Sequence, residues 1–134
     1  MTRYNFKIGT TLLGMTNVEE LTIPLQPPRY AFKDFQESVQ TPSGISKGLG
    51  YPSATWYWGF LTNEQLLQLR TFCPGESATI FIQTFTNEVE EDGDDELLVF
   101  TGVVHWPVEQ DRQAHKAIDF TLLFTNLVEI EPEE

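Results

Sequence analysis

A strand that leads directly into a capped helix constrains the fold of this chain more than any other stretch. In the strand, apolar residues alternate with small or polar ones, and this period of two predicts one buried face made of Ala54, Trp56, Trp58 and Phe60. Thr62 stands three residues before Gln65, which is the spacing of a capping box at a helix N-terminus. Pro74 and Gly75 end the helical pattern. The sequence therefore predicts a single helix, over about residues 62–73, packed on a sheet.

Alternating apolar residues predict strands in most of the remaining chain. They occur around residues 4–9, 77–85, 97–108 and 118–125, and residues 127–130 continue the last strand past a bend at Asn126. The run 21–25 contains Pro24, which restricts it to an edge or bulged strand. The chain has 134 residues, enough for one core and too few for two ordinary domains. We therefore expect one domain, residues 1–134, that is mainly β: a β-sandwich or a partly open β-barrel with one α-helix.

Residues 26–52 predict a long extended arm or loop. This stretch has four prolines and three glycines but no long regular apolar pattern. It still carries six large apolar side chains, which a flexible linker would not hold: Tyr30, Phe32, Phe35, Val39, Ile45 and Leu49. An irregular hairpin with its turn at residues 41–44 fits the pattern. Because exposed aromatic groups need a partner surface, we predict that these six residues form an assembly interface. The alternative is that the arm folds back over its own core.

The charge of the chain argues against binding to duplex nucleic acid. The formal net charge is −12, with seven acidic residues between Glu88 and Glu96 and four more in the last six positions. No basic patch is available to neutralise phosphates. Such a surface repels DNA, which suits a protein that DNA must pass without sticking. No apolar run approaches the roughly 20 residues of a membrane span, and the first ten residues lack a secretory apolar region.

The sequence offers no constellation for catalysis, a cofactor or a metal. His105 and His115 stand apart, and no nucleophile motif or glycine-rich phosphate loop occurs. The single cysteine, Cys73, excludes an internal disulfide and fits a small buried group on the helix. Asp92, Asp94 and Glu96 alternate and raise the question of calcium, but Gly93 is misplaced for an EF-hand loop. We expect a solvated hairpin tip there, and no enzyme activity.

Four stretches of the chain resemble a pattern of bacteriophage tail proteins. They are the strand–helix run 58–72, the following strand 75–82, the closing strand 119–128 and the entry 48–52, together within the last two thirds of the chain. The resemblance implies a tail tube subunit, or a related tail-tip or connector protein. It implies a sandwich or barrel flanked by one helix, with a long loop that reaches a neighbour. It also implies stacked hexameric rings that form the DNA channel.

On that reading the partners are copies of the same chain and other tail proteins, and DNA passes through without specific binding. The protein would be made in the cytoplasm of a bacterial host and reside in the virion. The competing hypothesis is a monomeric β-sandwich module that binds a carbohydrate or a protein through exposed aromatics, namely Trp56, Tyr57, Trp58 and Trp106. Trp56 and Trp58 share a strand face with Phe60, which favours a core position for both.

Overall fold

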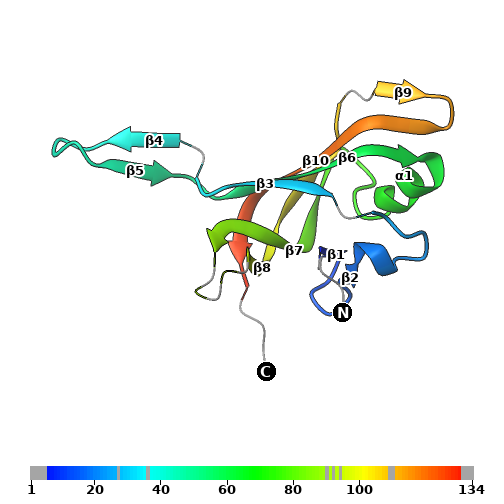
Figure 1. Ribbon diagram of the computed structural model, residues 1–134, viewed down its shortest axis with the longest axis horizontal. Coiled ribbons are helices and arrows are strands. Elements are labelled where there is room, and N and C mark those ends of the chain that lie inside the picture. The colour runs from blue at the N-terminus through cyan, green and yellow to red at the C-terminus, as the bar shows by residue number, and fades with distance from the viewer. Residues whose placement is uncertain are drawn as a thin grey trace.

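The computed structural model describes residues 6–26, 28–35, 37–89, 91, 93, 95–108 and 111–130. It is mainly β with one α-helix, as the sequence predicts (Figure 1). The elements in chain order are β1 (Lys7–Gly9), β2 (Thr16–Asn17), a 3-10 turn (Val18–Glu20), β3 (Arg29–Lys33), β4 (Glu37–Gln40), β5 (Ser46–Leu49), β6 (Ser53–Thr62), α1 (Asn63–Arg70), β7 (Ser77–Val89), β8 (Asp95–His105), β9 (Asp111–Gln113) and β10 (Lys116–Glu129).

The body is one strongly curved antiparallel sheet. Its strands follow the order β2-β1-β7-β8-β10-β6-β3, and β9 pairs with the start of β10. The curvature brings β3 back beside β7, where the Tyr30 and Phe85 ring centroids are 5.4 Å apart and Phe6 contacts both rings. Strands β3 and β7 are not paired within the described sheet, so the barrel is partly open and aromatic rings fill the seam.

The unit of β6 and α1 forms as predicted except at Phe60. This residue was expected on the buried face but is 49% exposed, because the alternation breaks before the helix and Leu61 takes the buried position. Trp56 and Trp58 are fully buried, and their indole N–H groups donate to the Thr84 hydroxyl at 3.0 Å and the Gln26 carbonyl at 2.8 Å. The Thr62 hydroxyl accepts from the Gln65 amide, and the Gln65 side chain accepts from the Thr62 amide, which completes the capping box. The helix ends at Arg70, shorter than the predicted 62–73.

The bend predicted at Asn126 is a β-bulge inside β10. Thr125 pairs with Val103 and Val128 pairs with Thr101, so two residues of β10 stand opposite Gly102 alone. Asn126 adopts a positive φ of 53° at this point. A Cβ on Gly102 would lie 2.7 Å from the Thr125 carbonyl oxygen, so the close approach of the strands requires glycine.

Two short segments differ from the predicted strands. Residues 21–25 form no strand; Leu25 is buried there, and the Gln68 side chain bonds both the N–H and the C=O of Ile23. The Gln68 side chain of the helix thus makes the hydrogen bonds to Ile23 that a neighbouring strand would otherwise make. Residues 111–113, where no strand is predicted, form β9, which pairs with β10. The predicted strand 4–9 is described only from residue 6, and Asp92, Asp94 and residues 131–134 lie outside the described residues.

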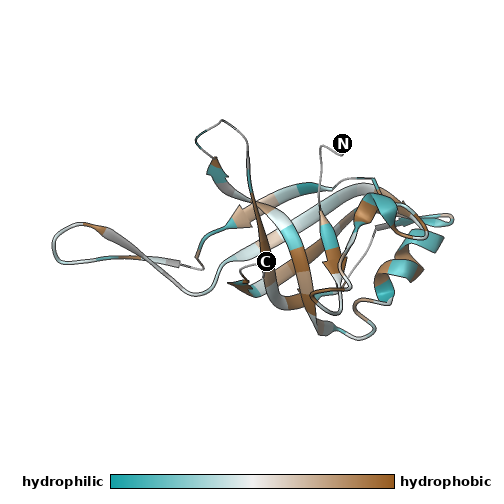
Figure 2. Cartoon of the chain, turned by 90° about the horizontal axis from the view of Figure 1, so that it is seen from below, coloured by the Kyte–Doolittle hydropathy of each residue, from teal (hydrophilic) through white to brown (hydrophobic). Residues whose placement is uncertain are grey.

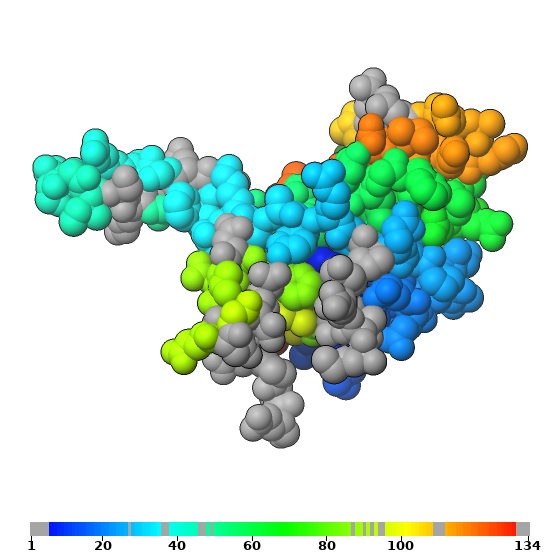
Figure 3. Space-filling model, in the orientation of Figure 1, coloured from blue at the N-terminus to red at the C-terminus, as the bar shows by residue number. Residues whose placement is uncertain are grey.

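The projecting part of the chain is shorter than the predicted 26–52. Its first portion is β3, which pairs with β6 from Arg29↔Tyr57 to Lys33↔Ser53 and so belongs to the body. Residues 34–52 then leave the barrel as a hairpin, here called the arm. Figure 3 shows the arm as a separate lobe beyond the compact body.

Candidate functional site

The arm is a regular hairpin with the predicted turn. Strands β4 and β5 pair from Glu37↔Leu49 to Gln40↔Ser46. At the tip, the Gly44 N–H donates to the Thr41 carbonyl at 2.9 Å, and the Thr41 N–H donates to the Ile45 carbonyl at 2.8 Å. Gly44 has a φ of 89°, a conformation that other residues rarely adopt. The tip therefore has a defined shape and can serve as a recognition element.

Apolar side chains of the arm are exposed to solvent. The exposed fractions are 67% for Ile45, 42% for Val39 and 40% for Phe35. Figure 2 shows the arm standing away from the body, with hydrophobic positions in brown along its strands. An isolated two-stranded hairpin is only marginally stable in water. A surface that covers these groups would supply the missing stabilisation, so the arm has the properties of an interface element.

The six predicted interface residues fall into two groups. Tyr30 and Phe32 lie on β3 in the body, where Tyr30 packs in the seam and Phe32 lies 5.5 Å from Phe100 between ring centroids. Phe35, Val39 and Ile45 belong to the arm and are exposed. Leu49 lies in β5, but its side chain is outside the described part of the structure. Tyr30 is 37% exposed despite its contacts in the seam, so it remains a candidate for contact with a partner together with the three exposed arm residues.

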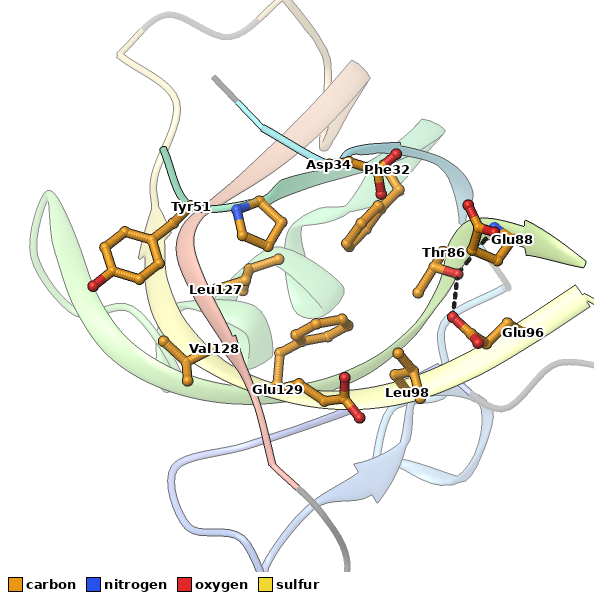
Figure 4. Close-up of a pocket in the computed structure, with 12 residues that line it drawn as sticks. Phe32, Asp34, Tyr51, Thr86, Glu88, Glu96, Leu98, Leu127, Val128 and Glu129 are labelled. Carbon is orange, nitrogen blue, oxygen red and sulfur yellow. Dashed lines mark hydrogen bonds between the residues drawn. The ribbon is translucent and has the colours of Figure 1, made fainter. Parts of the chain in front are cut away.

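A hollow opens in the barrel beside the base of the arm, at the end of β10 remote from α1. We call it the mouth. It has a volume of about 320 Å³ and is lined by Phe32, Asp34, Tyr51, Pro52, Thr86, Glu88, Glu96, Leu98, Phe100, Leu127, Val128 and Glu129. Figure 4 shows Phe32, Leu98 and Leu127 directed into the hollow, while Tyr51 points away from its centre. The mouth thus exposes part of the apolar interior of the barrel.

Carboxylates surround this apolar hollow. Glu96, Leu98 and Phe100 alternate along β8, and Glu129 pairs with Phe100 across the strands, so both glutamates share the face of the core. Asp34 and Glu88 complete the rim. The Thr86 hydroxyl donates to the Glu96 carboxylate at 3.0 Å and accepts from the Glu88 N–H at 3.1 Å, which fixes this side of the rim (Figure 4). The mouth therefore favours an apolar group that carries no negative charge.

Sequence reasoning did not identify the mouth. The alternation of Glu96 with Leu98 and Phe100 was a usable signal, because it places a carboxylate on the core face where the body ends. Glu88, Glu129 and Asp34 come from three other segments, and only the register of the sheet brings them to one rim.

Four side chains that could take part in acid–base or nucleophilic chemistry each contact a neighbour within the fold. His105 bonds the Thr125 hydroxyl at 2.7 Å on the sheet. The Arg70 guanidinium stacks 4.4 Å from the centre of the Trp106 ring and donates to the Cys73 and Gly75 carbonyls. Burial raises the pKa of the Cys73 thiol, although Arg70 acts in the opposite direction. The Tyr57 hydroxyl donates to the Asp119 carboxylate, and this bond raises the pKa of the tyrosine.

Within the described ranges, no group of three His, Cys, Asp or Glu side chains has the arrangement to hold a metal ion. None of the helices described is long and apolar enough to cross a membrane. Comparison with known proteins finds no matching family model, no matching curated protein and no matching solved structure. Function is therefore inferred from the arm, the mouth and the distribution of charge.

Proposed function

We propose that this protein is a non-enzymatic structural subunit of a bacteriophage tail, and that its copies form stacked hexameric rings around a DNA channel. The observation that carries the proposal is the arm. It is a hairpin of defined shape that stands clear of its own body and exposes Phe35, Val39 and Ile45. A neighbouring copy that covers these side chains removes apolar area from water and stabilises the hairpin at once.

The body supports the same proposal. A curved sheet with one helix is the architecture that the resemblance to tail proteins implies. The net charge of −12 suits a channel through which DNA moves without being held. Other tail proteins are then the expected partners besides copies of the chain itself, and the virion is the expected location.

The burial of the tryptophans weighs against a carbohydrate-binding module. Stacking on a sugar needs exposed aromatic faces, yet Trp56 and Trp58 are fully buried and Trp106 packs against Arg70 and Phe120. Of the platform considered from the sequence, only Tyr57 lies on the outer face of the sheet, where it bonds Asp119.

The test is the assembly state of the purified protein, with and without the tip of the arm. We expect the full chain to form rings or fibres in electron micrographs and to sediment far above the 15.3 kDa of one copy. Deletion of residues 41–47 is expected to leave circular dichroism and cooperative unfolding intact while it weakens assembly. A full chain that stays monomeric at every accessible concentration overturns the proposal. Unaltered assembly of the deleted chain shows that the tip of the arm is not an interface element.

A further inference from the structure

We infer that the mouth of one copy receives the tip of the arm of a second copy, an inference that rests on the proposed assembly. The mouth is a hollow of about 320 Å³ with an apolar interior, and the tip is the most exposed apolar segment of the arm, with Ile45 67% exposed. Pockets that enclose a ligand have volumes of roughly 300 Å³ and above, so the mouth is small for such a pocket. Its volume suits a small number of aliphatic side chains.

The charge of the tip is compatible with the rim of the mouth. Asp34, Glu88, Glu96 and Glu129 surround the entrance. Residues 38–63 contain neither Asp nor Glu, and Lys47 is the only Lys or Arg among them. This acid-free stretch includes the tip of the arm in a chain whose net charge is −12. The tip of the arm therefore brings no further carboxylate to the rim and is not repelled by it.

The shape of the molecule indicates that the arm enters the mouth of another copy. The arm leaves the body at the edge of its own mouth, where Asp34 and Tyr51 belong to the lining, and then extends away from it (Figures 1 and 3). Strands β4 and β5 have four residues each and alone span roughly 13 Å, so the tip stands well clear of this edge. A second copy beside the first therefore places its mouth within reach of the tip, and each copy in a closed ring gives one tip and receives one.

The charge dependence can be tested at Ile45 with two substitutions of opposite sign. Ile45 is exposed, so neither Ile45→Asp nor Ile45→Lys should alter folding, and cooperative unfolding checks this. We expect Ile45→Asp to raise the protein concentration for half-assembly by roughly tenfold or more and Ile45→Lys to assemble nearly as well as the parent. The difference should shrink at 1 M salt, where screening acts beyond about 3 Å. Glu129→Lys should restore assembly of Ile45→Asp. Equal losses for both charges, or no rescue, overturn the inference.

Proximity can be tested by disulfide formation between different copies. Ile45→Cys and Val128→Cys are prepared as separate proteins and mixed under oxidising conditions; Val128 is an exposed residue of the mouth lining. The native Cys73 is buried, and the parent protein controls for it. Gln113→Cys, in β9 beside the other end of β10, is the matched negative partner for Ile45→Cys. We expect a mixed dimer with Val128→Cys at least tenfold more abundant than with Gln113→Cys.

The outcomes separate this inference from the proposed function. Rings or fibres that form without the mixed disulfide, or with equal yields for the two partners, overturn the docking of the arm in the mouth and leave the tail function standing. A monomeric parent overturns both.

Discussion

The side chain of Thr62 fixes where α1 begins, because its hydroxyl satisfies the Gln65 amide at 3.3 Å. Removal of this acceptor leaves an N–H of the first turn without its partner. We expect Thr62→Ala to lower the free energy of unfolding by about 1 kcal/mol, measured by denaturant titration. Thr62→Ser keeps the hydroxyl and is the matched control, with little expected loss. An alanine variant as stable as the parent would mean that the cap does not stabilise the helix.

The thiol of Cys73 is expected to be inert in the folded protein. Only the thiolate reacts readily, and burial both excludes reagents and raises the pKa of this thiol. We predict negligible modification by a thiol reagent at pH 8 and complete modification after unfolding. Because the folded pKa lies above the unfolded value of about 8.5, the contribution of the protonated thiol to stability is complete below that pH. It is lost as the pH rises through the folded pKa. Rapid modification of the native protein would contradict the buried position.

At the scale of elements, the bulge in β10 depends on the glycine opposite it. A Cβ at Gly102 would lie 2.7 Å from both the Thr125 oxygen and the Leu127 side chain. We expect Gly102→Ala to lower the free energy of unfolding by about 1–3 kcal/mol through overpacking. Gly59, also in a strand, has open space at the same position, so Gly59→Ala is the matched control and should be neutral or slightly stabilising. Similar effects of the two changes in thermal unfolding would show that the bulge tolerates a side chain.

The elements that the sequence predicts well are those with local causes. The alternation of β6 up to Trp58, the capping box of α1 and the turn of the arm each depend on residues a few positions apart, and each forms where predicted. Phe60 was wrongly expected on the buried face, because Leu61 takes the buried position where the strand enters the helix. Residues 21–25 were wrongly expected to form a strand, because the partner of Ile23 is Gln68, 45 positions away. The short β9 was missed because its pairing with β10 is set by the sheet and not by its own composition.

At the scale of the whole molecule, long-range strand pairing also explains why the predicted interface grouped Tyr30 and Phe32 with residues of the arm. Their spacing and composition resemble those of Phe35 and Val39, but β3 pairs with β6, and the pairing places both rings on the body, where Phe32 is partly buried and Tyr30 stays 37% exposed. The mouth likewise exists only once the curved sheet brings residues of β7, β8, the end of β10 and β3 around one hollow. A class of fold could thus be predicted from local patterns, whereas the candidate site required the long-range register.

The final prediction concerns the wall of the proposed channel. A cationic wall would hold DNA through the release of counterions, while excess carboxylates repel phosphates over about 8 Å at physiological salt. The outer side of β3 carries exposed Arg29 and Lys33, so we expect this edge to face away from the channel. We predict that the sheet face nearest the axis has a net negative charge. The measurement is a structure of the assembled ring, in which the charged side chains that face the channel are counted.

A clear excess of Lys and Arg along the channel would contradict this prediction, and the net charge of −12 would then serve solubility alone. A second, independent readout is the salt dependence of DNA binding to assembled rings. A negative wall predicts no measurable retention of DNA even at low salt, where an exposed cationic surface binds most strongly. Charge reversal at Glu129, which lies on the rim of the mouth, distinguishes the mouth from the channel wall. If the arm fills the mouth, Glu129→Lys changes assembly and leaves the channel as repellent to DNA as before.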